Sequence, residues 1–186
     1  MRDDGPRWDE RYRATTPAEP RRPDGIQRWP DLDTQLPTTG RCLDIASGPG
    51  PVALWAAERG LEVTALDVSE VAIELLRAGA AALGYDARIE ARVVDLDDGL
   101  PADLVDLDLI VCQRFRDPSL TTAMVERLRV GGHAVVTVLS AVGAEHPGEF
   151  HAPAGALWNE FSDDERCEVV HHHEGDGIAH VVARRR

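Results

Sequence analysis

The stretch that decides the fold is RCLDIASGPG, residues 41–50. Its apolar first half carries one acidic residue, Asp44, and then breaks into a turn of small residues. A helix-like pattern, Val52 to Arg59, follows at once. In open parallel sheets, such a strand, glycine turn and helix hold nucleotide-like cofactors. The glycines allow close backbone approach, and the helix directs its N–H groups at the ligand.

Strand and helix patterns alternate through the rest of the chain. We expect strands at 42–46, 62–66, 88–94, 107–112 and 134–139, and helices at 51–59, 70–82 and 118–128, the last ended by Gly131-Gly132. A short helix at 153–161 and two final strands, 168–172 and 178–183, follow. Too few residues join these last strands for a crossover, so they must pair as an antiparallel hairpin. The sequence therefore predicts a Rossmann-like, doubly wound α/β fold, with a mostly parallel seven-stranded sheet and an antiparallel C-terminal edge hairpin.

The first 40 residues differ from this body, because they hold half of the chain's 12 prolines. We expect an N-terminal arm at 1–40 with one or two short helical turns, followed by a single cofactor-binding domain at 41–186. Trp29, Leu32 and Leu36 are spaced by three and four residues, so they are expected to pack as one apolar face of the arm.

Composition restricts the partners and the compartment. The net charge is −13 and all 20 basic residues are arginine, so we expect no nucleic-acid partner. No apolar run approaches ~20 residues, which predicts no membrane span, and the N-terminus lacks the apolar stretch of a signal peptide. The cysteines Cys42, Cys112 and Cys167 lie apart in apolar runs, which is typical of reduced core thiols in a cytoplasm.

Acidic residues at three strand ends distinguish between cofactor classes. Residues 48–53 fit the dinucleotide fingerprint G-x-G-x-x-G/A. Asp44, however, would repel a pyrophosphate at this turn, whereas it suits a ligand that carries an ammonium group. Asp67 closes the second strand, where a carboxylate binds ribose hydroxyls in either class, and Asp95 closes the third, where it could accept from an adenine amine. This pattern favours S-adenosylmethionine, which has an ammonium, a sulfonium and one carboxylate.

The same motifs resemble those of the class I S-adenosylmethionine-dependent methyltransferases. Residues 43–50 look like the glycine-rich first motif of that family, with Ala46 where the first glycine usually lies. Residues 63–69, 93–96 and 107–111 look like the motifs of its second, third and fourth strands. Residues 128–133 resemble its L-x-P-G-G turn, with Val130 in place of proline. The resemblance covers roughly residues 40–186, in order.

This resemblance implies a set of cofactor contacts. The methionine part would be held by Asp44 and the loop residues Ala46, Ser47, Gly48 and Gly50. The ribose would be held by Asp67, and the adenine by Val68, Asp95 and Leu96, with Gln113 lining the site. S-adenosylhomocysteine would be the product.

The arm carries a further likeness. Residues 8–12, WDERY, are similar to a W-(D/N)-x-R-Y segment in small methyltransferases of the tellurite-resistance type. In those proteins the arm folds over the cofactor. Trp8, Arg11 and Tyr12 are therefore candidates for a lid, with packing of the arm onto the body as the other interpretation.

The methyl acceptor is expected to be a small molecule. Arg114 and Arg116 could attract an anionic acceptor or could be plain surface arginines. His146 and His151 are candidates for a general base, with loop packing or solvent exposure as the alternative. Alignment alone can supply ~7–11 kcal/mol, so no dedicated base is required when the acceptor is already nucleophilic.

Two other functions stay open. An NAD(P)-binding oxidoreductase would need a second catalytic region, for example a Tyr-x-x-x-Lys pair, and the chain has no lysine. A non-catalytic S-adenosylmethionine-binding regulator would keep the fold without turnover.

The histidines at 171–173 suggest a metal site at first sight. In a strand, His171 and His173 point to one side and His172 to the other. Two imidazoles on one face fall short of the three or four ligands of a stable zinc site. We therefore expect no metal and a solvated edge strand.

Overall fold

The structure is a computed structural model that describes residues 4–186. The chain forms two compact units. The first joins the N-terminal segment that ends at Arg22 to Pro37–Pro101, and the second joins Pro23–Leu36 to Ala102–Arg186. The seven strands form a mixed sheet that is parallel except in the C-terminal strands, so the predicted Rossmann-like fold class is confirmed.

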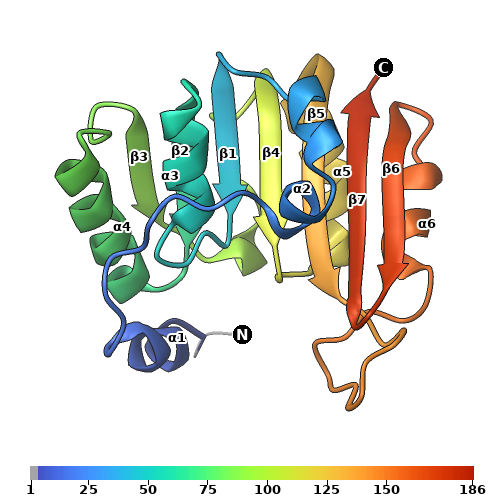
Figure 1. Cartoon of the computed structure of the whole chain (residues 1–186), viewed down its shortest axis with the longest axis horizontal. Helices are drawn as coiled ribbons and strands as arrows, with labels where there is room; N and C mark the ends of the chain where they lie inside the picture. Colours follow the sequence, from blue (N-terminus) through green and yellow to red (C-terminus); the bar gives the residue numbers. More distant parts are fainter. Residues whose placement is uncertain (1–3) are drawn as a thin grey trace. The chain divides into compact units, whose positions relative to one another are not determined.

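The first unit contains three parallel strands in the order β3-β2-β1 (Figure 1). They are β1 (Arg41–Ile45), β2 (Glu62–Asp67) and β3 (Ile89–Val93), and they pack against α3 (Pro51–Glu58) and α4 (Glu70–Leu83). The pairing of Ile45 with Leu66 and of Asp67 with Val93 aligns the carboxyl ends of the strands. Asp44 and Asp67 therefore come to one edge of these strands.

The local sequence explains where α3 and α4 begin. Gly50 precedes α3 with a φ of 77°, and a side chain there would collide with Leu76 of α4. Only glycine allows the two helices to approach this closely. Ser69 caps α4, because its side-chain oxygen accepts a hydrogen bond from the Ala72 N–H at 3.1 Å.

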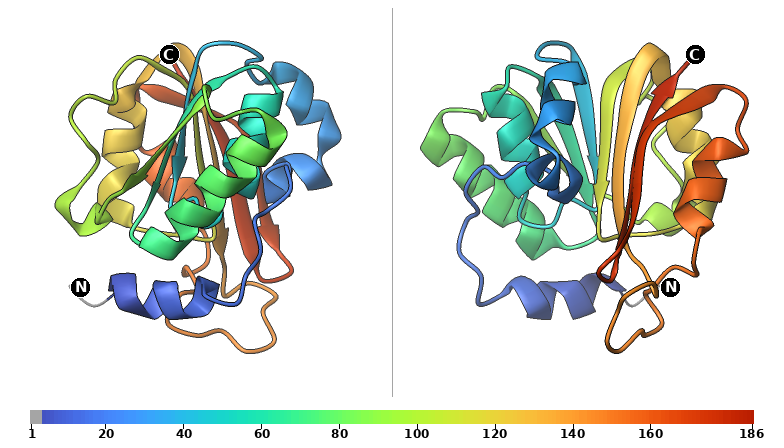
Figure 2. Two further views of the ribbon diagram at one scale, coloured as in Figure 1. Left: turned by 90° about the vertical axis from the view of Figure 1, so that its left-hand side faces the viewer. Right: turned by 45° about the vertical axis from the view of Figure 1, so that its right-hand side comes forward.

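The start of the chain adds a short helix to this unit. Helix α1 (Asp4–Tyr12) contacts α4, and Figure 2 shows it lying beside the beginning of that helix. None of its described residues is fully buried. Helix α1 is thus an attachment to the unit and not a part of its core.

The second unit contains four strands in the order β4-β5-β7-β6. They are β4 (Leu107–Gln113), β5 (Leu128–Leu139), β7 (Ile178–Arg185) and β6 (Cys167–Gly175), of which only β4 and β5 pair in parallel. In Figure 2 these strands separate α2 (Asp24–Arg28) from α5 (Pro118–Arg127) and α6 (Ala156–Ser162). The 3₁₀ turn η1 (Pro30–Gln35) follows α2, and its Leu32 is buried together with Leu36.

The predicted boundary between α5 and β5 is wrong. Helix α5 ends at Arg127, and Gly131-Gly132 lie inside β5, which begins at Leu128 instead of Ala134. Pairing with β4 is irregular here, and a side chain at Gly132 would lie 2.6 Å from the Leu107 carbonyl oxygen. The two glycines therefore allow a bulge within a strand and do not stop a helix.

The next helix also begins later than predicted. Helix α6 starts at Ala156 instead of Pro153, because Gly155 precedes it in a left-handed conformation with a φ of 71°. The turn Gly175-Asp176-Gly177 joins β6 to β7, as the sequence predicts.

The predicted faces of the histidine strand are confirmed, but its solvation is not. Trp158 contacts His172 on one face, whereas Trp29 lies with its ring centroid 4.7 Å from those of both His171 and His173 on the other. Pattern reasoning placed these rings in solvent because their cover, Trp29, comes from a distant part of the sequence. The three histidine rings are therefore covered although β6 lies at the edge of the sheet.

His180 of β7 completes this packing. It is fully buried, stacks on Trp29 at 5.6 Å between ring centroids, and places Nδ1 3.0 Å from the Thr137 hydroxyl oxygen. A side chain at Gly25 would collide with the His180 ring, so α2 rests directly on it. Within residues 4–186, the Nε2 atom of His180 has no hydrogen-bond partner.

We predict that this buried imidazole makes the protein less stable in acid. Burial lowers the pKa of His180 from its ordinary value of 6.5 to about 3. The unfolded chain therefore binds the extra proton first, and the free energy of unfolding should fall by about 1.4 kcal/mol per pH unit as the pH drops below 6.5. Denaturant unfolding of wild type and His180→Met at pH 7.5, 6 and 5 measures this slope.

In His180→Met, the free energy of unfolding should fall less steeply as the pH drops, with a slope smaller than that of wild type by about 1.4 kcal/mol per pH unit. His146→Gln is the control, because His146 is exposed and its removal should leave the wild-type slope unchanged. Equal slopes in wild type and His180→Met would show that His180 does not titrate between the two states.

Candidate active site

The glycine turn after β1 uses three left-handed residues. Ala46, Gly48 and Gly50 have φ values of 53°, 54° and 77°. Ala46 takes the left-handed conformation at the position where the family resemblance predicts a glycine, which costs roughly 1–2 kcal/mol for an alanine. The turn thus keeps the backbone path expected of glycine.

Asp44 is a buried acid beside this turn. It is 2% exposed, and its Oδ2 atom has no hydrogen-bond partner among the described residues. The pKa of Asp44 is raised from 3.8 to about 8, mainly by burial; a hydrogen bond from the Ala53 backbone lowers it, and the neighbouring Asp67 makes a smaller contribution that raises it. The carboxyl group therefore holds a proton at neutral pH unless a cation lies beside it.

Asp67 joins two backbone segments. Its Oδ2 accepts from the Gly48 N–H at 2.7 Å, and its Oδ1 accepts from the Ser69 N–H at 2.9 Å. The side chain is 6% exposed, and burial raises its pKa. The carboxylate thereby fixes the glycine turn relative to the beginning of α4.

Helix α1 brings aromatic residues to the same turn. The Tyr12 hydroxyl oxygen lies 2.9 Å from the place that a side chain of Gly48 would occupy. Trp8 stacks on Tyr12 with ring centroids 5.9 Å apart, and the Arg11 guanidinium lies 5.3 Å from the centre of the Trp8 ring. Burial and the charge of Asp67 raise the pKa of Tyr12. The three residues predicted for a lid thus lie together, with Tyr12 against the turn.

The residues predicted for the adenine lie at the ends of β2 and β3. Asp95 is exposed, and its carboxylate accepts from the Asp97 N–H at 3.0 Å, which caps the short 3₁₀ turn η2 (Leu96–Asp98). Leu96 is buried, whereas Val68 is half-buried. Together with Asp44, Asp67 and the lid residues, they all belong to the first unit.

The remaining predicted residues belong to the second unit. Gln113 ends β4, and its Oε1 accepts from the Asp24 N–H at 2.9 Å. Arg114 has a φ of 59° and donates from Nε to Asp24 at 2.9 Å. Arg116 donates from Nε to Glu160 at 3.1 Å. Both arginines therefore have carboxylate partners within their own unit.

The two predicted histidines lie in the long connection between β5 and α6. His146 is exposed, and His151 accepts a hydrogen bond at Nδ1 from the Gly148 N–H at 2.9 Å. Glu174, which sequence reasoning missed, accepts from the Ser140 hydroxyl at 2.7 Å and from the Gly155 N–H at 2.9 Å. It holds the two ends of this connection, and no local motif marks it.

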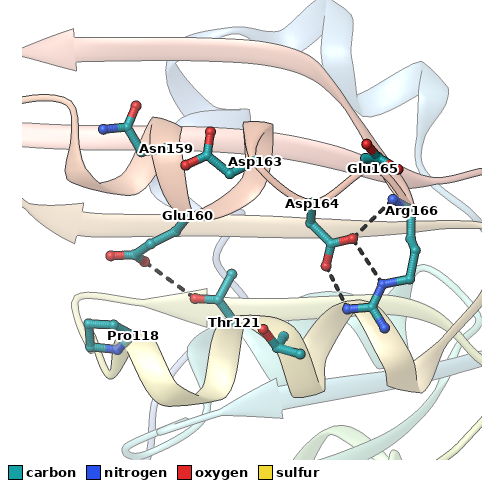
Figure 3. Close-up of a pocket in the computed structure, with 9 residues that line it drawn as sticks. Pro118, Thr121, Asn159, Glu160, Asp163, Asp164, Glu165 and Arg166 are labelled. Carbon is teal, nitrogen blue, oxygen red and sulfur yellow. Dashed lines mark hydrogen bonds and ion pairs between the residues drawn. The ribbon is translucent and has the colours of Figure 1, made fainter.

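A pocket of about 660 Å³ lies at α5 and α6 in the second unit (Figure 3). Its acids are partly neutralised within the protein, because Glu160 pairs with Arg116 and Asp164 pairs with Arg166 at 2.7 Å. Thr121 also donates to Glu160 at 3.3 Å. None of the residues that the sequence predicts for the cofactor or the acceptor lines this pocket.

The described residues contain neither a cluster of metal ligands nor a helix that could span a membrane. Across residues 4–186, no group of three or more His, Cys, Asp or Glu side chains is placed to hold a metal ion. No helix in the described part of the chain has the length and apolar character that crossing a bilayer requires.

Part of the chain is similar to known methyltransferases. A family described as "Methyltransferase domain" matches residues 42–132. A ubiquinone biosynthesis O-methyltransferase of Alkalilimnicola ehrlichii is 29% identical over 105 residues, which cover 54% of this chain and 42% of that protein. The chain spans less than half the length of the curated relatives that it matches.

Solved structures share the fold. TehB from Haemophilus influenzae superposes with a TM-score of 0.62 at 22% identity, over 78% of this chain and 57% of that chain. Geranyl diphosphate C-methyltransferase from Streptomyces coelicolor, solved with Mg²⁺, geranyl diphosphate and S-adenosyl-L-homocysteine, gives a TM-score of 0.70 at 14% identity over 87% of this chain and 81% of that chain. Residues 42–132 of the chain therefore match a methyltransferase domain, and the solved structures share the Rossmann-like fold of the chain.

Proposed function

We propose that the protein transfers the methyl group of S-adenosyl-L-methionine to a small-molecule acceptor. The observation that carries this proposal is the buried Asp44 Oδ2 atom, which has no hydrogen-bond partner in the described part of the chain. A buried polar group without a hydrogen bond is costly, and a buried carboxylate is more costly still. The ammonium group of the cofactor would give Asp44 both a hydrogen bond and a compensating charge.

The neighbouring residues suit the remaining parts of this cofactor. The Asp67 carboxylate accepts backbone N–H groups from Gly48, Val68 and Ser69, and the roughly four lone-pair sites of a carboxylate leave capacity for a ribose hydroxyl. The methionine part would lie along the turn formed by Ala46, Ser47, Gly48 and Gly50. The adenine would contact Val68, Asp95 and Leu96, and Gln113 remains a candidate from the second unit.

The arm has a proposed role of its own. We treat residues 1–40 as an arm on a 41–186 cofactor-binding domain, in which Trp8, Arg11 and Tyr12 cover the cofactor. The stacked pair of rings beside Gly48 would exclude water from the glycine turn. Alignment and exclusion of water are the main contributions that a protein makes to methyl transfer.

The bound cofactor would supply a methyl carbon that is already activated by the sulfonium. We retain Arg114 as a candidate for contact with an anionic acceptor. Arg116 is better explained by its pairing with the part-buried Glu160. Both candidate bases, His146 and His151, use one ring nitrogen within their loop: Nδ1 of His146 lies 2.6 Å from the Glu145 carbonyl oxygen, and Nδ1 of His151 accepts from the Gly148 N–H. Neither histidine is therefore favoured over the other.

A cytoplasmic location belongs to the same proposal. Cys42, Cys112 and Cys167 are buried and form no disulfide among the described residues, which fits a reducing compartment. The oxidoreductase alternative has less support, because a buried acid at the glycine turn opposes a pyrophosphate. A non-catalytic regulator would bind the same cofactor, and turnover with a panel of acceptors distinguishes it from an enzyme.

Ligand-induced stabilisation tests the cofactor. At about 100 times the dissociation constant, a ligand adds ~2.7 kcal/mol to the free energy of unfolding, which corresponds to a rise of roughly 5–10 °C in the melting temperature. We expect this rise with S-adenosylmethionine and S-adenosylhomocysteine and none with NAD. Asp67→Ala should lose it, whereas Asp163→Asn, an exposed acid of the second unit, should keep it. A rise with NAD alone would contradict the proposal.

The Asp44→Asn variant should separate stability from binding. With its pKa at about 8 in the folded protein instead of 3.8, Asp44 holds a proton that the unfolded chain releases. Its ionisation therefore removes stability as the pH rises from 4 to 8, by up to about 1.4 kcal/mol per pH unit. Asparagine does not ionise, so the unliganded variant should be the more stable protein at pH 8, with a difference that shrinks toward pH 4.

The same variant should bind the cofactor about tenfold to a hundredfold more weakly, because it loses a charged hydrogen bond. Calorimetry in buffers of different ionisation enthalpy should detect proton release on binding to wild type at pH 7 and none with Asp44→Asn. The control is Glu62→Gln, an exposed acid at the other end of β2. Equal affinity and equal proton release in wild type and Asp44→Asn would contradict the proposed role of Asp44.

A further inference from the structure

Helix α1 has little of its own to hold it in place. It spans nine residues, and none of those that the structure describes is fully buried. Helices this short are marginal in water unless tertiary contacts support them. The position of Tyr12 and Trp8 must therefore depend on specific contacts between α1 and the rest of the first unit.

Asp9 makes such a contact with the beginning of α4. Its Oδ1 accepts from the Ser69 hydroxyl at 2.6 Å and from the Val71 N–H at 3.2 Å. The Ser69 oxygen in turn accepts from the Ala72 N–H at 3.1 Å. A carboxylate from one helix and a serine at the start of another thus share the free N–H groups of the first turn of α4.

Charge supports the same contact. The amino-terminal end of a helix carries a partial positive charge, which favours a carboxylate there. The hydrogen bond from Ser69 is the largest of the effects that lower the pKa of Asp9. The side chain is therefore ionised at neutral pH, as this contact requires.

A continuous series of contacts connects Asp9 to the candidate cofactor site. Ser69 also donates its backbone N–H to Asp67, and Asp67 accepts from the Gly48 N–H. Tyr12 lies over Gly48 and follows Asp9 by three residues on the same helix, which places the two side chains on neighbouring turns. A shift of Asp9 would therefore move Tyr12 away from the glycine turn.

We propose that Asp9 is a positioning residue, which fixes α1 over the glycine turn by completing the cap of α4. Loss of the Asp9 contact frees α1, and the cofactor is then held less tightly. This second half rests on the proposed function. The first half concerns the unliganded protein and can be tested without any ligand.

Trypsin tests the first half, because α1 contains Arg11 and the chain continues with Arg13 directly after it. Cleavage at these sites requires the helix to open. Without ligand, Asp9→Ala should be cut there at least tenfold faster than wild type, and Asp9→Asn, which keeps an acceptor oxygen, should lie between. The control is Glu10→Gln, a neighbouring acid whose pairing with Arg13 is exposed, and it should be cut like wild type.

Calorimetry with S-adenosylhomocysteine tests the second half. Asp9→Ala should bind it at least tenfold more weakly, with Asp9→Asn again between and Glu10→Gln unchanged. Wild-type rates of cleavage together with wild-type affinity in Asp9→Ala would overturn the proposal. If Asp9→Ala is cleaved faster but the wild-type protein does not bind S-adenosylhomocysteine, Asp9 still anchors α1. The proposed function is then rejected.

A double-mutant cycle covers the case in which Asp9→Ala does not fold. Asp9→Asn and Ser69→Ala remove parts of the same contact, so their effects on cleavage at Arg11 and Arg13 should be non-additive. Additive effects would show that the two side chains act independently, and would overturn the assignment of Asp9.

Discussion

The carboxylate of Asp67 is the interaction on which the candidate site depends. It accepts one backbone N–H from the turn after β1 and another from the start of α4. Gly48 of the turn lies 19 residues before Asp67, and Ser69 at the start of α4 lies two residues after it. Local sequence preference alone therefore does not set the distance between the turn and the helix. Together with the hydrogen bond from the Ser47 N–H to the Leu66 carbonyl oxygen at 2.9 Å, Asp67 therefore fixes how the glycine turn faces the end of β2. Through Ser69, Asp67 is also linked to the helix that carries Tyr12.

A second buried acid makes this arrangement costly. Asp44 and Asp67 lie near enough that the charge of Asp67 raises the pKa of Asp44, in addition to the larger effect of burial. A protein selected only for stability would replace one of them with a neutral side chain. Strongly shifted acids that cluster beside a glycine turn are instead typical of functional sites, where stability is lost so that a ligand of opposite charge can restore it.

The sequence was sufficient for the parts of the fold that local patterns determine. The strand, turn and helix around residues 41–58 and the Ser69 cap depend on residues close together in the chain, and the structure has them as predicted. Gly131-Gly132 misled the prediction because the same conformational freedom serves a helix end and a strand bulge. His171 was misjudged because strand periodicity predicts its face, while its cover, Trp29, comes from 142 positions earlier. Asp9 was missed because an acid in a short polar helix ordinarily faces water.

The two halves of the arm are held by different kinds of interaction, and this difference bears on which half can move. Segment 23–36 is held mainly by packing, since Gly25 rests on the His180 ring and Trp29 stacks on it. Its ion pair between Arg28 and Asp176 is largely exposed to solvent, so it contributes little to the stability of this segment. Helix α1 has no such packed centre and relies on hydrogen bonds at its Asp9 contact. Each of those bonds contributes only about 1–2 kcal/mol net, so α1 can detach at a cost that ligand binding can match, whereas release of segment 23–36 would expose a buried aromatic cluster.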